Sequence, residues 1–176
     1  MLVLDAVGDD EQHLLRRVAG LVGAVAGVGD VARLAELAVI TGENSEEQQT
    51  LCERAVAVAE EAGSGKSQAI ALRARGRMHL ERENWAAAEL DLQQSLQKCT
   101  ELDIPWERGQ TLYCLGNYYR RRAAILNQDK DGERIADMDR AHQHFEQAQG
   151  FFEALKAVHD AERTRVALAQ ESNAPV

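Results

Sequence analysis

The sequence lacks the basic excess that a nucleic-acid or membrane-surface partner requires. It holds 20 Lys and Arg against 29 Asp and Glu, for a net charge of -9. Proteins that bind phosphate groups neutralise them with basic residues, so neither nucleic acid nor a membrane is an expected partner. Proline is rare, with two residues, and hydrophobic residues make up 45% of the chain. These values exclude a collagen-like or a disordered chain and indicate a globular protein.

Cysteine and long apolar runs are also scarce. The three cysteines, Cys52, Cys99 and Cys114, form no C-x-x-C pair and have no histidines at zinc-finger spacing. The longest apolar run, residues 18–29, is broken by glycine and falls short of the roughly 20 residues that span a bilayer. The first ten residues lack the positive region of a secretory signal. We therefore expect a cytoplasmic protein without a bound metal or cofactor.

Apolar residues recur at spacings of three and four, which is the helical period, and no alternating strand pattern of useful length is present. Asp30, Ser45 and Pro105 are typical of helix starts, and Asp103 stands just ahead of Pro105. We expect seven or eight helices joined by short turns. The segments that break the helical pattern are 27–30, 41–45, 63–65, 83–84, 103–105 and 127–132.

Part of the chain repeats at a spacing of forty residues. Leu72 and Gly76 are followed forty residues later by Leu112 and Gly116. Small residues recur where two helices would cross closely, and large residues fill the space beside them. Such helix pairs cannot bury their apolar faces alone, so neighbouring pairs stack into one core. The pattern consists of Leu72, Gly76, Trp85, Ala88, Leu92, Ser95 and Leu96, then Leu112, Leu115, Gly116, Tyr119, Ala141, Phe145 and Ala148.

At these residues the chain resembles the tetratricopeptide repeat family, whose unit is a pair of helices. Arg75 and His79 depart from the family pattern, which has leucine and tyrosine there. The spacing exceeds the usual 34 residues and is similar to a longer variant found in bacterial regulatory and signalling proteins. The resemblance implies an all-α, right-handed α-α superhelix of about three helix pairs in a single domain. Its expected parts are an N-terminal helix at 9–27, units at 30–62, 66–102 and 105–150 with an insertion at about 123–136, and a capping helix at 152–171.

The segment Gly63-Ser64-Gly65-Lys66-Ser67 is similar to a phosphate-binding loop. Two requirements fail, because the first glycine of that motif is replaced by Glu60 and the preceding segment is predicted to be a helix instead of a strand. We expect a turn between units here.

The segment Asn127-x-Asp129-x-Asp131-Gly132 begins like a calcium-binding loop, but its twelfth position is Met138 instead of glutamate. We therefore expect a polar loop between two lengthened helices. The face shared by Asp139, His142 and Glu146 is interpreted as solvated helix surface.

The resemblance also implies where a partner binds, because in such arrays the first helix of each pair lines an inner groove. Arginine binds carboxylates at two points, and asparagine can hold a peptide backbone. An alternative is that Arg73 and Arg77 form a solvated face, with Glu81 paired to Arg77. The groove positions are Ile70, Arg73, Ala74, Arg77, Leu80 and Glu81, then Gln110, Tyr113, Cys114, Asn117, Arg120 and Arg121.

We expect a non-catalytic protein-protein interaction module that binds a peptide or helix, acidic in character, in an arginine-lined groove. No residue pattern makes a positive case for an enzyme. One alternative is a self-associating structural module, a homodimer; a further alternative is a nucleotide- or calcium-responsive regulator. The candidate binding residues are Arg73, Arg77, Leu80, Tyr113, Asn117, Arg120 and Arg121.

Overall fold

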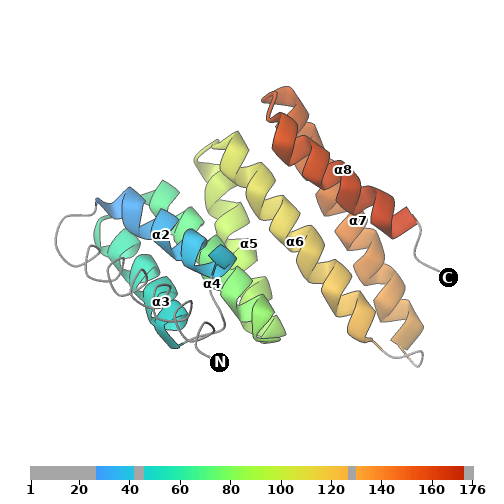
Figure 1. The fold of residues 1–176 in the computed structure, drawn as a ribbon, viewed down its shortest axis with the longest axis horizontal. Helices are drawn as coiled ribbons and strands as arrows, with labels where there is room; N and C mark the ends of the chain where they lie inside the picture. The colour runs from blue at the N-terminus through green and yellow to red at the C-terminus, as the bar shows by residue number, and fades with distance from the viewer. Residues whose placement is uncertain (1–26, 42–45, 127–129, 173–176) are drawn as a thin grey trace, which may run out of the picture.

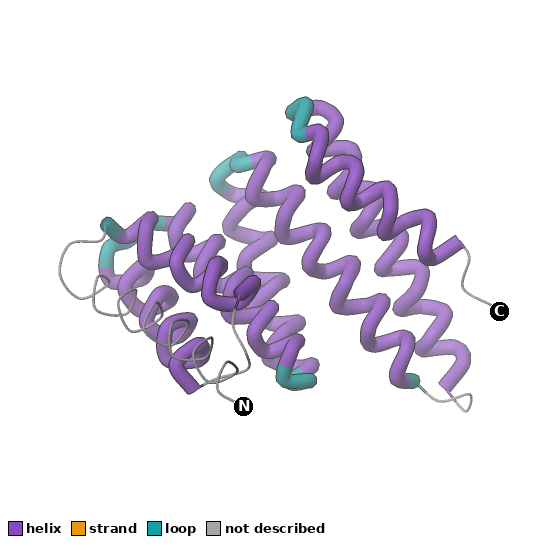
Figure 2. The backbone as a smooth tube through the Cα atoms, viewed as in Figure 1, coloured by secondary structure: helices purple, strands orange, loops and turns teal. Residues whose placement is uncertain are grey.

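The computed structural model describes residues 27–41, 46–126 and 130–172. Over these residues the chain is all helical, with no strand (Figure 2). The helices pack as adjacent pairs in chain order, which confirms the all-α prediction. The N-terminal helix expected at 9–27 and the helix start expected at Ser45 lie outside the described residues. The helices are α2 (Val28–Thr41), α3 (Glu46–Glu61), α4 (Gly65–Glu81), α5 (Trp85–Glu101), α6 (Pro105–Ile125), α7 (Asp131–Ala154) and α8 (Val158–Ser172).

The helices form two layers along the chain. Helix α4 packs against α2, α3, α5 and α6, so it contacts its sequence neighbours and also the helices two places away. Helix α8 packs on α7 and is joined to α6 by a hydrogen bond from Gln110 Nε2 to Asp160 Oδ1 of 2.9 Å. Helices α2, α4, α6 and α8 therefore lie in succession on one side of the array, as Figure 1 shows.

Four of the connections between helices share one backbone geometry. Each has three residues, and the middle residue adopts a left-handed conformation: Gly63, Glu83, Asp103 and Lys156, with φ between 48 and 63°. At the first connection the N–H of Gly63 donates to the carbonyl of Glu60 and the N–H of Ser64 donates to that of Ala59. The same pair of bonds recurs at the other three, and it is the Schellman arrangement that closes a helix C-terminus.

Lys156→Gly is expected to stabilise the protein by roughly 0.5–1 kcal/mol, because glycine adopts the left-handed conformation at little steric cost. Lys156 has a φ of 56° and is exposed, so its side chain contributes little packing. Urea unfolding would measure the change. The converse variant, Gly63→Ala, should destabilise the protein, and equal effects from the two substitutions would contradict the prediction.

Helix boundaries agree with the expected ones in part. Pro105 occupies the first turn of α6 as predicted. Asp30 does not begin a helix; α2 begins at Val28 and Asp30 lies within its first turn. The expected capping helix at 152–171 is wrong at its start, because Phe152 is fully buried within α7 and the break falls at residues 155–157. The insertion expected at 123–136 is mostly helical, since α6 continues to Ile125 and α7 begins at Asp131.

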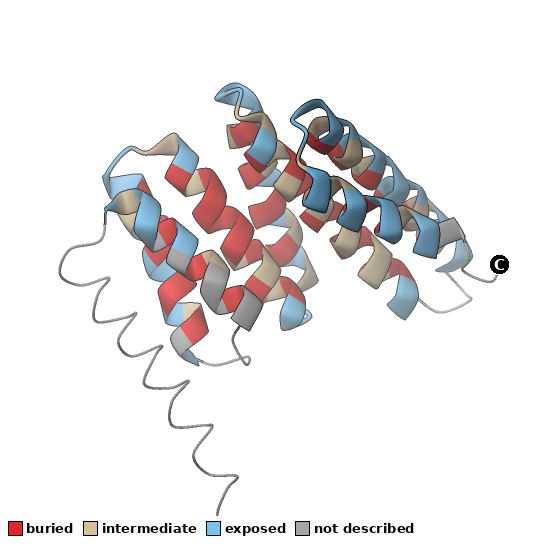
Figure 3. Ribbon diagram, turned by 45° about the horizontal axis from the view of Figure 1, so that its top comes forward, coloured by how far each residue is buried: buried red, intermediate tan, exposed pale blue. Residues whose placement is uncertain are grey.

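Glycine allows the two close helix crossings that the repeat pattern predicts. A Cβ atom added at Gly76 would lie 2.9 Å from Cγ of Leu92, and one added at Gly116 would lie 2.6 Å from Cε1 of Phe145. Leu92 and Phe145 are fully buried, so each large side chain fills the space that its glycine leaves. Figure 3 shows that buried residues gather where helices face one another, while the turns are exposed.

The departures from the family pattern at Arg75 and His79 are explained by one buried carboxylate. Arg75 makes two hydrogen bonds to Asp91 of α5, of 2.7 and 2.8 Å. His79 Nε2 lies 3.8 Å from the same carboxylate. Burial lowers the pKa of His79, and Asp91 opposes that shift. A polar cluster thus replaces the leucine and tyrosine that the family has at this helix contact.

Candidate functional site

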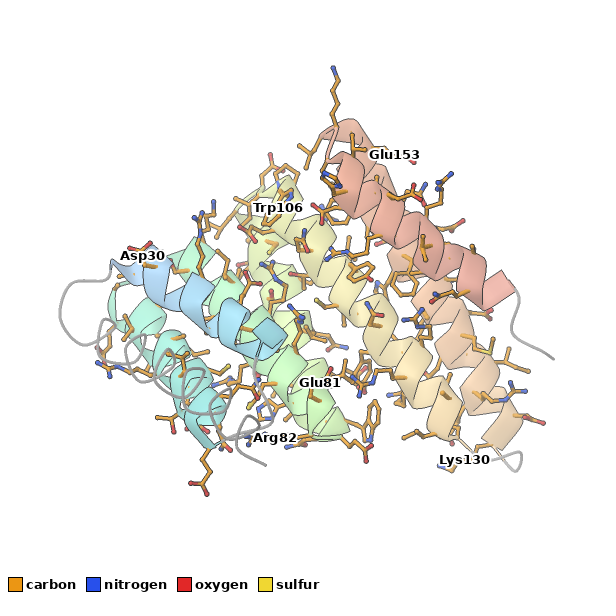
Figure 4. The ribbon with its side chains drawn as sticks, in the orientation of Figure 1. Asp30, Glu81, Arg82, Trp106, Lys130 and Glu153 are labelled. Carbon is orange, nitrogen blue, oxygen red and sulfur yellow. The ribbon has the colours of Figure 1, made fainter. Side chains whose placement is uncertain are left out.

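A pocket of about 370 Å³ opens on the side of the array formed by α2, α4, α6 and α8. Figure 4 shows side chains between α4 and α6, with Glu81 near the end of α4. The lining residues of α4 and of α6 are one, three or four positions apart, so they form one stripe on each helix. The pocket is lined by Glu36, Arg73, Arg77, Leu80, Glu81, Gln110, Tyr113, Cys114, Asn117, Arg121 and Arg163.

The structure brings together most of the candidate binding residues. Arg120 is the exception, because it does not line the pocket: its guanidinium donates to Gln170 Oε1 at 3.0 Å and to Asn117 Oδ1 at 2.8 Å. Arg120 therefore connects α6 to α8 beside the pocket. The candidates that line the pocket are Arg73, Arg77, Leu80, Tyr113, Asn117 and Arg121.

Arg73 belongs to a buried ion-pair cluster that joins three helices. Its side chain is only 2% exposed, and NH2 lies 2.6 Å from Glu36 Oε1 of α2 and 2.8 Å from Glu107 Oε2 of α6. Burial by itself would lower the pKa of Arg73, but Glu36 and Glu107 outweigh it and raise the pKa. The interpretation of Arg73 as part of a solvated face is wrong, and its charge is already neutralised by these partners.

Arg121 pairs across the helices with Glu81. Its NH1 lies 2.7 Å from Glu81 Oε1, and both side chains are exposed. The alternative pairing of Glu81 with Arg77 on its own helix is therefore wrong. An exposed pair of this kind contributes at most about 1 kcal/mol to stability.

Asn117 uses both ends of its side-chain amide within the protein. Nδ2 donates to the carbonyl of Tyr113 at 2.9 Å, and Oδ1 accepts from Arg120 at 2.8 Å. These two bonds fix the orientation of the amide and leave one Nδ2 hydrogen and one Oδ1 lone pair for a peptide backbone.

Arg163 of α8 is a pocket residue that the sequence interpretation missed. NH2 lies 3.0 Å from Asp160 Oδ1 and donates to Gln110 Oε1 at 2.9 Å, while Cζ lies 4.1 Å from the centre of the Tyr113 ring. The spacing of the helices contained a signal for Arg163, because α8 begins 53 residues after α6. That interval is the forty-residue spacing lengthened by the insertion, so Arg163 corresponds to Gln110.

Arg77 and Cys114 form the part of the pocket with the fewest polar contacts. Among the residues that the structure describes, Arg77 has no ion pair or hydrogen bond, and it is half-buried. Burial raises the pKa of the Cys114 thiol, although the positive charge of Arg77 opposes this shift. Cys114 is therefore a neutral thiol at the pocket, without the lowered pKa of a nucleophilic cysteine.

The structure describes the whole of the glycine-rich motif at 63–67 and only the end of the motif at 127–132. Ser64 is the N-cap of α4, and its side chain accepts a hydrogen bond from the backbone N–H of Ser67. The preceding element is helix α3, as the sequence predicts, and a phosphate-binding loop requires a strand there. Of the second motif, Asn127 and Asp129 lie outside the described residues, while Asp131 and Gly132 lie in the first turn of α7.

Metal binding and membrane spanning were also considered for the described helices. No group of three or more His, Cys, Asp or Glu side chains in this part of the chain is arranged to hold a metal ion. None of these helices has the length and apolar character needed to cross a bilayer.

The sequence was compared with models of known protein families and with curated proteins, and neither comparison finds a match.

Proposed function

We propose that this protein is a tetratricopeptide-like helical repeat that acts as a non-catalytic protein-binding module. The order of paired helices, the glycines at the close crossings and the shared connections support a repeat of this kind. The proposed occupant is a peptide or helix of a partner protein, and the proposed role is regulatory or scaffolding.

One observation carries the proposal: a single pocket receives side chains from all four helices on one side of the array. Glu36 comes from α2, Arg77 from α4, Tyr113 from α6 and Arg163 from α8. The half-buried Tyr113 and the edge of the buried Leu80 line the pocket beside polar groups, and a binding site for a peptide needs this combination.

Charge reversal at Arg77 and Arg121 is expected to weaken partner binding by about tenfold or more, because both line the pocket and acidic ligands would then be repelled. Affinity capture from the native cell identifies partners, and titration with the captured partner measures the affinity. The melting temperature should fall only slightly, because neither residue is buried in the core and the exposed pair of Arg121 with Glu81 contributes at most about 1 kcal/mol to stability.

The matched control reverses Arg33 and Arg54, which are exposed on α2 and α3 and do not line the pocket. It gives the same net charge, so a general electrostatic effect would appear in both variants. Unchanged binding in the Arg77 and Arg121 variant would reject the pocket as the binding site.

A further inference from the structure

The arginines of the pocket differ in whether a carboxylate of the protein already neutralises them. Arg73 is neutralised by Glu36 and Glu107, and Glu107 also lies 4.0 Å from Lys66. The remaining cations that line the pocket with a carboxylate partner are Arg121, paired with Glu81, and Arg163, paired with Asp160. Within the described residues, Arg77 is the pocket cation that forms no ion pair with a carboxylate, although Glu36 and Glu81 line the same pocket.

The amide side chains of the pocket are engaged as well. Gln110 donates to Asp160 and accepts from Arg163, and Asn117 is bonded at both ends to α6. A ligand whose main chain needs hydrogen-bond partners would find each amide already making two hydrogen bonds and held in orientation by them.

We infer that Arg77 is the residue that receives the ligand, and that the ligand supplies one carboxylate on an acidic side chain of the partner protein. This inference rests on the proposed function and names the chemistry of its partner. A half-buried guanidinium without a counter-charge gains most from a carboxylate, which it binds through two parallel hydrogen bonds. The carbon stem of glutamate or aspartate would lie beside Leu80 and Tyr113.

A side chain suits the pocket better than a chain terminus does. A terminal carboxylate brings the amide and carbonyl groups of its own residue into the pocket, where Gln110 and Asn117 are oriented toward partners within the protein and each already makes two hydrogen bonds. Leaving such groups without partners costs binding energy. An acidic side chain enters on an apolar stem and carries no such groups with it.

One carboxylate is expected instead of several because of Glu81. To bind a second acid, Arg121 would have to leave Glu81, whose carboxylate also lines the pocket. The freed Glu81 would then repel the ligand and offset the new contact.

The test uses blocked tripeptides, which carry no terminal charge. Acetyl-leucyl-glutamyl-leucinamide is titrated into the full chain and followed by NMR, and the isosteric glutaminyl peptide serves as its neutral match. Peptides of this size bind in the millimolar range. The glutamyl peptide is expected to bind at least tenfold more tightly than the glutaminyl peptide, as for a charge-assisted hydrogen-bonded pair.

Arg77→Met should abolish this preference, because the variant keeps an unbranched apolar stem and removes the charge. Arg54→Met, the matched control at an exposed arginine of α3 that does not line the pocket, should leave the preference intact, and the melting curve of each variant verifies folding. A peptide with two glutamates should bind no more tightly than the peptide with one.

Several results would overturn the inference. They are equal affinity of the two peptides, no binding of the glutamyl peptide at millimolar concentration, a preference that survives Arg77→Met, and tighter binding of a free leucyl carboxyl terminus. If the partner is still lost on charge reversal but retained by Arg77→Met, the binding module stands and the carboxylate assignment falls.

Discussion

Arg73→Met is expected to lower the free energy of unfolding by about 3–5 kcal/mol, the usual cost of removing one partner from a buried ion pair. The side chain of Arg73 is 2% exposed, and its guanidinium contacts Glu36 of α2 and Glu107 of α6. Without it the Glu107 carboxylate stays buried and loses the hydrogen bond from Arg73 NH2 at 2.8 Å. Urea unfolding followed by circular dichroism measures the change.

Two further variants separate the loss of the ion pair from the loss of packing. Adding Glu36→Gln and Glu107→Gln to Arg73→Met removes the uncompensated charges and should recover most of the lost stability. Arg165→Met, at an exposed pair with Glu162 on α8, should leave the free energy of unfolding essentially unchanged, because exposed ion pairs contribute little. A loss below about 1 kcal/mol for Arg73→Met would show that this cluster does not hold the three helices together.

Gly116→Ala is expected to destabilise the protein by about 2 kcal/mol, although alanine favours helix more than glycine does. The added Cβ atom would lie 2.6, 2.7 and 2.9 Å from three ring atoms of Phe145. Phe145 is fully buried between α6 and α7, so its ring cannot move aside without disturbing the core. Thermal and urea unfolding report the loss.

Gly150→Ala is the matched control, since Gly150 also lies inside a helix but has nothing within 4 Å of an added Cβ atom. It should stabilise the protein by about 0.5–1 kcal/mol through helix propensity alone. Phe145→Leu combined with Gly116→Ala should show a coupling energy of about 1 kcal/mol or more, because the two residues share one contact. Equal effects at Gly116 and Gly150 would contradict the close crossing.

Sequence periodicity was sufficient to predict the helices, and the resemblance to tetratricopeptide repeats implied the side of the array where candidate residues meet. Arg73, Arg77 and Leu80 recur at helical spacing, and so do Tyr113, Asn117 and Arg121, so local geometry places each set on one face. The pocket that these residues line was thus accessible from the sequence, except for the part contributed by α8.

The sequence did not predict which of the charged side chains in the pocket have ion-pair partners. Arg73 and Arg77 occupy adjacent turns of one helix and look equivalent in the sequence. They differ because Glu36 and Glu107, which are 37 and 34 residues from Arg73, reach only one of them. The sequence also did not predict the hydrogen bond from Arg120 to Asn117, because that bond depends on side-chain orientation. Contacts of this kind depend on how helices pack, which a spacing pattern does not contain.

The start of α8 was misplaced for a local reason. Phe151 and Phe152 lie just before a break whose residues, Leu155-Lys156-Ala157, include neither glycine nor proline. Lys156 adopts the left-handed conformation in spite of its side chain. A helix end made by backbone hydrogen bonds alone leaves no compositional signal.

The four matching connections have a consequence for how long the array can be. Gly63, Glu83, Asp103 and Lys156 differ in size and charge, yet their backbones close the preceding helix in the same way. The joint therefore forms with residues of different size and charge, and another helix pair can be inserted at such a joint without new turn chemistry. Gene duplication would lengthen the array by whole units, while Arg77 and its neighbours keep their places on α4 and α6.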